Sequence, residues 1–283
     1  MEQFTGSAPE HICALFRDGC SGTVEMVNSR GIYLRLGENL VLLCHSHFGT
    51  VPNGASLDQW DRLPLLLTMG QPVRVEDSVL YCPGCSLELR LRSVPRDLRI
   101  FSPPAGTPCA GLSVLLAQAK ETGLSSLVYP LFTDSTPRMN PYCTVALPWV
   151  KALLQALAEE NEEGIRASAQ MLLGLGPGLT PSGDDFLCGL LYGLRHSPAR
   201  DTASCAALTK AVLELAGERT NAVSADCLAS VARDAPFDRI AAAWTDPEAG
   251  ALDLTRIGSN SGCEMLLGLL CAEHAISTLT GAS

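Results

Sequence analysis

The sequence predicts an α+β protein: an N-terminal antiparallel β sandwich or barrel in residues 1–105, followed by a C-terminal helical bundle in residues 106–283. Three observations support this division. Apolar and polar residues alternate before residue 105, and apolar residues recur at helical spacing after it. The run IFSPPAGTPCAG between the two parts is rich in proline and glycine, as connections often are.

The β-rich domain is expected to contain short strands joined by turns. The segments TVEMV and IYLRL flank the turn Asn-Ser-Arg-Gly at residues 28–31, which is the pattern of a β-hairpin. Four further alternating runs predict strands: LVLLC, PVRVE, SVLYC and LELRLR. No helical period lies between these runs, and such a series is typical of a small sandwich or barrel.

Helical spacing begins at Leu112. The run LSVLLAQAKETG ends on a glycine at the position that commonly follows a helix, and residues 145–174 hold one or two more helices. The same rhythm predicts further helices in residues 205–219, 221–234, 237–244 and 263–279.

Charge and composition exclude several classes of partner. A formal net charge of −10 offers no electrostatic basis for binding nucleic acid or an anionic membrane. The start MEQFTGSAPEHICALF lacks the basic and apolar regions of a secretion signal, and no uninterrupted apolar run reaches the roughly 18 residues of a membrane span. We therefore expect a cytoplasmic protein.

Twelve cysteines are expected to stay reduced, because no secretion signal precedes them. Only Cys82 and Cys85 have the spacing of a redox pair or a metal site. A thioredoxin-like motif should open a helix, yet this pair lies between two predicted strands. A zinc site would need a second set of ligands, such as Cys44, His45 and His47. A plain hairpin turn is the simplest interpretation.

The run GLGPGLTPSGDDFLCG, residues 174–189, combines a glycine-rich loop with the start of an apolar helix. Thr180 is a suitable N-cap and Pro181 suits the first helical position. Unpaired N–H groups and the macrodipole at a helix start attract anions, and the loop glycines let a ligand approach closely. Asp184 and Asp185 would repel such an anion unless a cation such as Mg²⁺ lay between them.

The same pattern recurs later in the chain. Residues 182–191 align with residues 261–270, so that serine, glycine, an acid and a second glycine fall in step. Thr180 and Ser259 occupy equivalent N-cap positions in the two segments. We expect two helices whose starts converge and present unpaired N–H groups, hydroxyls and carboxylates to one point. The alternative remains that the acids only complement the helix dipole, an effect of about 0.3–1 kcal/mol each.

This motif resembles the signature of the H-type subunit family of bacterial oxamate carbamoyltransferase. The likeness extends to TNAVSADCLASVA (220–232) and GSNSGCEMLLG (258–268), and FGTVPNG (48–54) is similar to a turn in the N-terminal half of the family. The resemblance implies a role in anaerobic allantoin and purine degradation, where oxalurate and phosphate yield oxamate and carbamoyl phosphate. It also implies two larger protein subunits as partners. No catalytic residue is carried over from the family.

The residues themselves suggest how such a site would work. Carbamoyl transfer needs a stabilised oxyanion, and Asn221 or Asn260 could add amide donors to the backbone N–H groups. The missing positive charge would come from Lys151, Arg166, Arg219, Arg239 or Arg256, from a partner subunit or from Mg²⁺. Of the five side chains we favour Arg256 and Arg219.

The predicted catalytic residues are Asp184, Asp185 and Glu264, and the first two are also the candidate ligands of Mg²⁺. The predicted residues for binding substrate or phosphate are Gly176, Gly178, Thr180, Ser182, Gly183, Thr220, Asn221, Ser224, Ser259, Asn260, Ser261, Gly262 and Arg256. The ligand would be carbamoyl phosphate, oxalurate, oxamate or phosphate.

Two other functions remain open at this stage. The chain could be a self-sufficient Mg²⁺-dependent phosphotransferase or ligase that uses ATP at the glycine-rich loop. It could equally be a non-catalytic scaffold or an anion-sensing protein that keeps the loop for stability. If it is a carbamoyltransferase subunit, its role could be catalytic or accessory.

Overall fold

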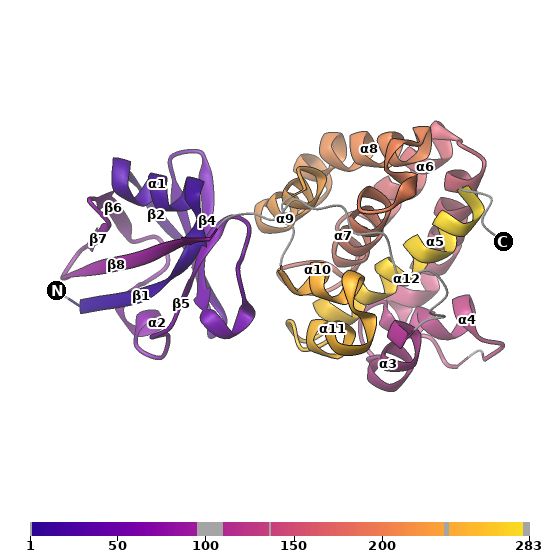
Figure 1. Ribbon diagram of the computed structural model, residues 1–283, viewed down its shortest axis with the longest axis horizontal. Helices are drawn as coiled ribbons and strands as arrows, with labels where there is room; N and C mark the ends of the chain where they lie inside the picture. The colour runs from indigo at the N-terminus through magenta and orange to yellow at the C-terminus, as the bar shows by residue number, and fades with distance from the viewer. Residues whose placement is uncertain (1, 95–109, 136, 235–237, 280–283) are drawn as a thin grey trace. The chain divides into compact units, whose positions relative to one another are not determined.

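The computed structural model describes residues 2–94, 110–135, 137–234 and 238–279. The chain divides into two compact units, Met1–Asp97 and Leu98–Ser283 (Figure 1). Each unit has a hydrophobic cluster of its own. The boundary predicted near residue 105 lies outside the described residues.

The described part of the first unit is a closed barrel of eight strands (Figure 1). In barrel order the strands are β1 (Glu2–Pro9), β5 (Gly54–Leu57), β4 (Asn39–His45), β3 (Gly31–Leu36), β2 (Cys20–Val27), β6 (Pro72–Glu76), β7 (Val79–Cys82) and β8 (Cys85–Val94). The connections include the helices α1 (Glu10–Asp18) and α2 (Leu63–Leu66) and the 3-10 turn η1 (Ser46–Phe48). Leucines at 34, 43, 57 and 87 are fully buried in the cluster of this unit.

A barrel is therefore confirmed, and a sandwich is not. The predicted hairpin is present between β2 and β3, where the Asn28 side chain accepts hydrogen bonds from the N–H groups of Arg30 and Gly31. The prediction of a wholly antiparallel sheet is wrong, because β1 pairs with β8 and β4 with β5 in parallel. Strand β1 closes the barrel through residues distant in sequence, which its own short pattern does not reveal.

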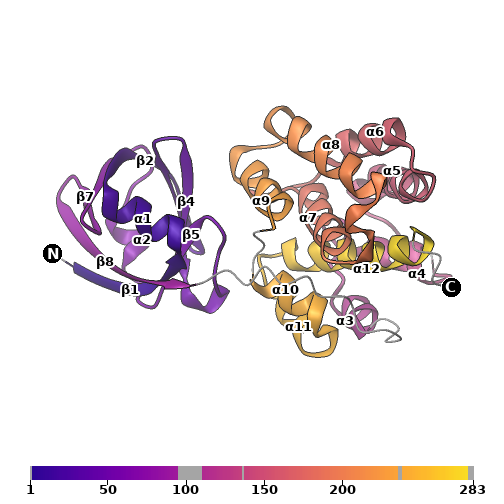
Figure 2. The ribbon, with the colours of Figure 1, turned by 45° about the horizontal axis from the view of Figure 1, so that its top comes forward.

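The described part of the second unit is helical (Figure 2). Its helices are α3 (Ala110–Gln118), α4 (Val128–Phe132), α5 (Pro141–Ala158), α6 (Glu162–Leu172), α7 (Ser182–Arg195), α8 (Ala203–Arg219), α9 (Ala222–Ala232), α10 (Asp238–Thr245), α11 (Pro247–Leu254) and α12 (Ser261–Leu279). Two 3-10 turns, η2 (Ser125–Leu127) and η3 (Pro198–Asp201), lie among them.

Helices α7 and α12 form the centre of this unit and lie side by side (Figures 1 and 2). Residues 182–194 of α7 and residues 262–272 of α12 are buried throughout. A helical C-terminal part is thus confirmed, whereas the regular bundle that we expected is not. No helix of the described residues is long and apolar enough to cross a membrane.

Candidate functional site

The starts of α7 and α12 converge, as the repeated sequence pattern predicts. The Thr180 and Ser261 side-chain oxygens are 3.0 Å apart. A β-carbon on Gly189 would lie 2.0 Å from the Met265 carbonyl oxygen, and one on Gly268 would lie 2.1 Å from that of Phe186. The two glycines therefore allow the helix backbones to touch, and this contact brings the repeated motifs together.

The acid of each helix accepts a hydrogen bond from the first serine of the other helix. Asp185 accepts from Ser261 and from the Thr180 hydroxyl, the latter at 3.0 Å. Glu264 accepts from Ser182 and, at 2.9 Å, from the Leu124 N–H group. The two helices are thus joined by reciprocal hydrogen bonds, in which a serine hydroxyl of each helix donates to a carboxyl group of the other.

Asp184 faces a different set of partners from Asp185. Its Oδ1 atom accepts from the Gly174 N–H group at 2.8 Å, and its Oδ2 atom accepts from the hydroxyls of Thr220 and of Ser224, the latter at 2.7 Å. Successive helical residues point about 100° apart, since about 3.6 residues make one turn. Asp184 therefore joins the glycine-rich loop to the start of α9, whereas Asp185 joins α7 to α12.

Burial dominates the electrostatics of all three acids. Asp184, Asp185 and Glu264 are only 1–2% exposed, and burial raises the pKa of each. For Asp185 the nearby charge of Glu264 raises the pKa further, while hydrogen bonds from hydroxyls oppose the rise. Two like charges so placed do not ionise together readily, so the Asp185–Glu264 pair favours holding a proton.

The helix starts are less bare than the sequence suggests. The Gly183 N–H group donates to the Leu175 carbonyl at 2.8 Å, and the Gly262 N–H group donates to the Ile257 carbonyl at 3.1 Å. Thr180 is not the N-cap that we expected, because Pro181 holds that position without a side-chain cap. The Thr180 hydroxyl is instead bonded to Asp185. The loops before the helices fold back and supply these carbonyl partners.

The predicted binding residues differ in exposure, and Ser182, Gly183, Ser224 and Gly262 are buried. Gly178, Ser259 and Asn221 are exposed, while Gly176, Thr180 and Asn260 are half-buried. The Asn221 side chain caps α9 by accepting from the N–H groups of Val223 and Ser224, and it donates to the Leu179 carbonyl at 2.7 Å. The exposed residues of the motif thus belong to the segments that precede α7, α9 and α12, whereas the three carboxyl groups are buried.

A fourth segment, residues 120–124, packs against Glu264 and was missed by sequence reasoning. A β-carbon on Gly123 would lie 1.9 Å from the Glu264 Oε1 atom and 3.0 Å from the Ser182 Oγ atom. Asn260 donates to the Thr122 hydroxyl at 3.0 Å. The charge of Lys120 is close enough to Cys263, in the first turn of α12, to oppose the rise in its pKa that burial causes. Gly123 was visible in the sequence only as a residue that follows a helix.

Four of the five predicted cations contact other partners. Arg256 forms a long ion pair of 3.8 Å with Asp253, and Arg239 pairs with the same aspartate at 3.1 Å. Arg219 donates to the Gln170 carbonyl at 3.1 Å, and Arg166 pairs with Glu214. Lys120, which sequence reasoning did not select, is a cation whose charge acts on Cys263 at the start of α12.

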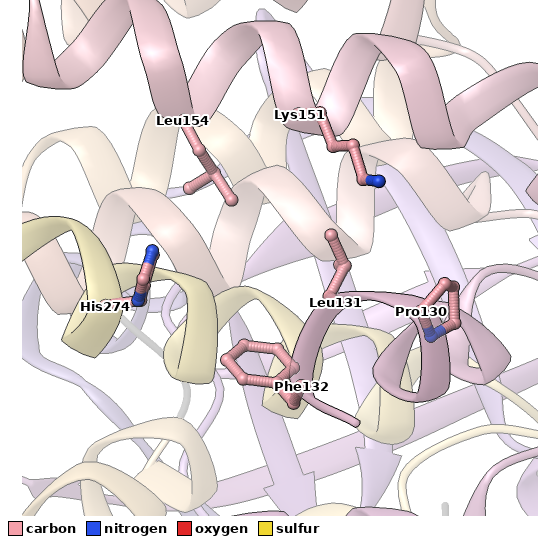
Figure 3. A pocket seen from close by; sticks show the side chains of 6 residues that line it. All are labelled: Pro130, Leu131, Phe132, Lys151, Leu154 and His274. Atoms are coloured by element: carbon pink, nitrogen blue, oxygen red, sulfur yellow. The ribbon is translucent and has the colours of Figure 1, made fainter. Parts of the chain in front are cut away.

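Lys151 lies in a separate pocket of about 360 Å³. The pocket is lined by side chains of α4, α5 and α12, namely Pro130, Leu131, Phe132, Lys151, Leu154 and His274 (Figure 3). His274 follows Glu264 by ten positions on α12, which is about 15 Å along a helix. This pocket is therefore distinct from the converging helix starts.

The surroundings of Asp184 do not fit a magnesium ion. N–H and O–H hydrogens already point at both of its carboxyl oxygens, and a cation would have to displace them. Within the described residues no group of three or more His, Cys, Asp and Glu side chains could hold a metal ion. Magnesium at Asp185 stays a prediction. Among the described residues, no third His, Cys, Asp or Glu side chain lies where it could bind zinc together with Cys82 and Cys85.

Comparison with known families confirms the resemblance seen in the sequence. The family model described as oxamate carbamoyltransferase subunit AllH matches residues 172–273. This stretch runs from the end of α6 into α12 and contains the glycine-rich loop, the start of α9 and the start of α12. No curated protein and no solved structure matches the chain.

Proposed function

We propose that this chain is a subunit of an oxamate carbamoyltransferase complex that converts oxalurate and phosphate to oxamate and carbamoyl phosphate. The family match over residues 172–273 supports membership of such an enzyme complex. One observation carries the location of the site. Signature residues from three separate segments are joined by hydrogen bonds at the starts of α7, α9 and α12.

In this proposal the anionic substrate lies over the exposed residues Gly178, Asn221 and Ser259. The exposed loops offer amide and hydroxyl donors to a phosphate or carboxylate group. Lys120, which follows α3 and whose charge acts on Cys263 in the first turn of α12, would supply positive charge. Two larger subunits would close the site from outside and contribute the remaining groups.

The reaction requires a proton as well as an anion site. A phosphate oxygen attacks the carbamoyl carbon and the phosphate gives up its proton, the bond from that carbon to nitrogen breaks, and the nitrogen takes up a proton to leave as the amide of oxamate. The Asp185–Glu264 pair is suited to supply it, because its environment favours the protonated form. Thr180 is half-buried, and its hydroxyl, which is bonded to Asp185 and lies 3.0 Å from that of Ser261, connects the acid to the loop before α7.

A scaffold role is the alternative that a specific observation favours. Within the described residues, every fully buried side-chain nitrogen and oxygen atom has a hydrogen-bond partner. Three acids that are fully bonded within the protein would stabilise the crossing of α7 and α12 without any chemistry. The two roles differ in what they predict for conservative substitutions.

Reconstitution with the two larger subunits tests the proposal through phosphate-dependent cleavage of oxalurate. Asp185→Asn and Glu264→Gln keep the shape of the side chains and remove the titrating group, and we expect kcat to fall by about 10²–10³. Glu160→Gln, an exposed position in the turn after α5, serves as the control and should match wild type. Unchanged activity of both acid variants in a folded complex would refute the proton role and favour the scaffold.

A further inference from the structure

The turn between β7 and β8 places two thiols in direct contact. Cys82 and Cys85 are paired across these antiparallel strands, with only Pro83 and Gly84 between them. Their Sγ atoms are 2.7 Å apart. Directly opposed residues on antiparallel strands have Cα atoms about 4.5–5.5 Å apart. That spacing lies inside the range of about 4.4–6.8 Å that a disulfide spans.

Neighbouring residues hold this turn in place. The Gln71 side chain donates to the Pro83 carbonyl at 3.3 Å and accepts from the Thr68 N–H group at 2.9 Å. The Cys85 thiol faces the Leu66 carbonyl at 3.9 Å. Gly84 has a φ of +87°, a conformation that glycine adopts without strain. The fold thus maintains the approach of the two sulfur atoms rather than leaving it to a mobile loop.

The pair is also accessible and has the chemistry of a dithiol rather than of a metal site. Both cysteines are half-buried, so a small reagent can reach them. Burial and the neighbouring thiol raise the pKa of Cys82 to about 12, so Cys82 of the reduced pair is an uncharged thiol. In the part of the chain that the structure describes, no third His, Cys, Asp or Glu completes a metal site with them.

We propose that Cys82 and Cys85 form a reversible dithiol–disulfide site whose oxidant is a low-molecular-weight disulfide. One cysteine loses its proton, its thiolate attacks a sulfur of the reagent, the S–S bond of the reagent breaks, and one reagent thiolate leaves and takes up that proton. The second cysteine then attacks the protein sulfur of the mixed disulfide and releases the second reagent thiolate. Two protein thiols lose two electrons in total, the reagent is reduced to two thiols, and the two thiol protons pass to them.

The test exposes the full-length chain to oxidised glutathione, blocks free thiols with N-ethylmaleimide and identifies the modified peptides by mass spectrometry. The peptide that contains residues 82–85 should carry no label and be lighter by two hydrogen atoms, and dithiothreitol should restore labelling. Closure should be at least about tenfold faster in the folded chain than in urea, because the fold holds the sulfurs together. Cys20, a half-buried thiol of β2, is the internal control and should not form an internal disulfide.

Single variants separate the two steps. In Cys82→Ser and in Cys85→Ser the remaining thiol should retain glutathione as a mixed disulfide, because no second thiol can displace it. Mixed disulfides that persist at both positions of the wild-type chain would overturn the proposal. Closure that is no faster in the folded chain than in urea would overturn it as well, and this comparison needs no variant to fold. Neither result bears on the proposed carbamoyltransferase role.

Discussion

Two adjacent aspartates, Asp184 and Asp185, occupy different environments. Asp184 accepts hydrogen bonds from Gly174, Thr220 and Ser224, whereas Asp185 is bonded across the helix contact. Both residues are at most 2% exposed to solvent. Their roles are therefore separable by substitution, although the sequence presents them as a pair.

Asp184→Ala should destabilise the helical unit by about 2 kcal/mol or more, because a buried unsatisfied group costs about 1–3 kcal/mol. The substitution leaves the buried Ser224 hydroxyl without its acceptor, together with the hydroxyl of Thr220 and the N–H group of Gly174, which are half-buried. Urea denaturation followed by circular dichroism measures the loss. Asp184→Asn, which keeps one acceptor oxygen, should lose less. A loss below about 1 kcal/mol for the alanine variant would contradict the hydrogen-bond network described above.

The stability difference between wild type and Asp185→Asn should depend on pH. Burial and Glu264 raise the folded-state pKa of Asp185 above the unfolded value, which is about 3.9. The favourable contribution of the protonated group is therefore complete below about pH 4 and is lost as pH rises through the folded-state pKa. The variant carries no such titration, so its stability relative to wild type should increase from pH 4 to pH 8. Urea midpoints measured across this range check the trend, and a constant difference would contradict it.

The starts of α7 and α12 pack against the preceding helices in the same way. A β-carbon on Gly183 would lie 1.9 Å from the Leu172 carbonyl oxygen, and one on Gly262 would lie 1.8 Å from that of Leu254. Each glycine therefore packs against the end of the preceding helix, α6 in the first case and α11 in the second. The loop before α7 is the longer of the two, and it holds the Gly-Pro-Gly run of the family signature.

Gly189→Ala should destabilise the contact between the two helices by about 2–3 kcal/mol. Its β-carbon would overlap the Met265 carbonyl oxygen, 2.0 Å away, and overpacking in a core costs about 1–3 kcal/mol. Gly217→Ala in α8 is the matched control, because a β-carbon there meets nothing within 4 Å. That change should stabilise the helix by about 0.5–1 kcal/mol. Thermal unfolding of both variants gives the comparison, and equal shifts would contradict the close approach.

The whole molecule consists of two units with separate cores. Among the described residues, the hydrophobic cluster of the barrel is drawn from residues 4–91, and that of the helical unit from residues 112–279. The family match lies entirely within the helical unit. The proposed carbamoyltransferase site and the proposed dithiol site thus belong to different units.

Residues 1–97 and 98–283, expressed as separate chains, should each fold. Each unit has its own apolar cluster, and a domain with its own core can fold alone. Circular dichroism should show one cooperative thermal transition for each chain. A barrel fragment without a transition would contradict this expectation and would indicate that its stability depends on the helical unit.

Local patterns were sufficient wherever neighbours in sequence are neighbours in space. This holds for the hairpin between β2 and β3 and for the helix at 205–219, which were predicted from local patterns. The likeness between residues 182–191 and 261–270 is visible directly in the sequence. Closure of the barrel through parallel pairing of β1 with β8 could not be predicted this way, because that pairing joins the two ends of the unit.

The sequence by itself determined that two helices begin alike, with glycine, hydroxyl and acid at matching positions, since helical period and motif spacing are local properties. Only the tertiary structure decided which partner each acid faces. Asp184 is hydrogen-bonded to Ser224 of α9, Asp185 is hydrogen-bonded to Ser261 of α12, and Gly123 packs against Glu264. The physical reason is that buried polar groups must find hydrogen-bond partners wherever packing brings them, and packing joins residues that no local pattern connects.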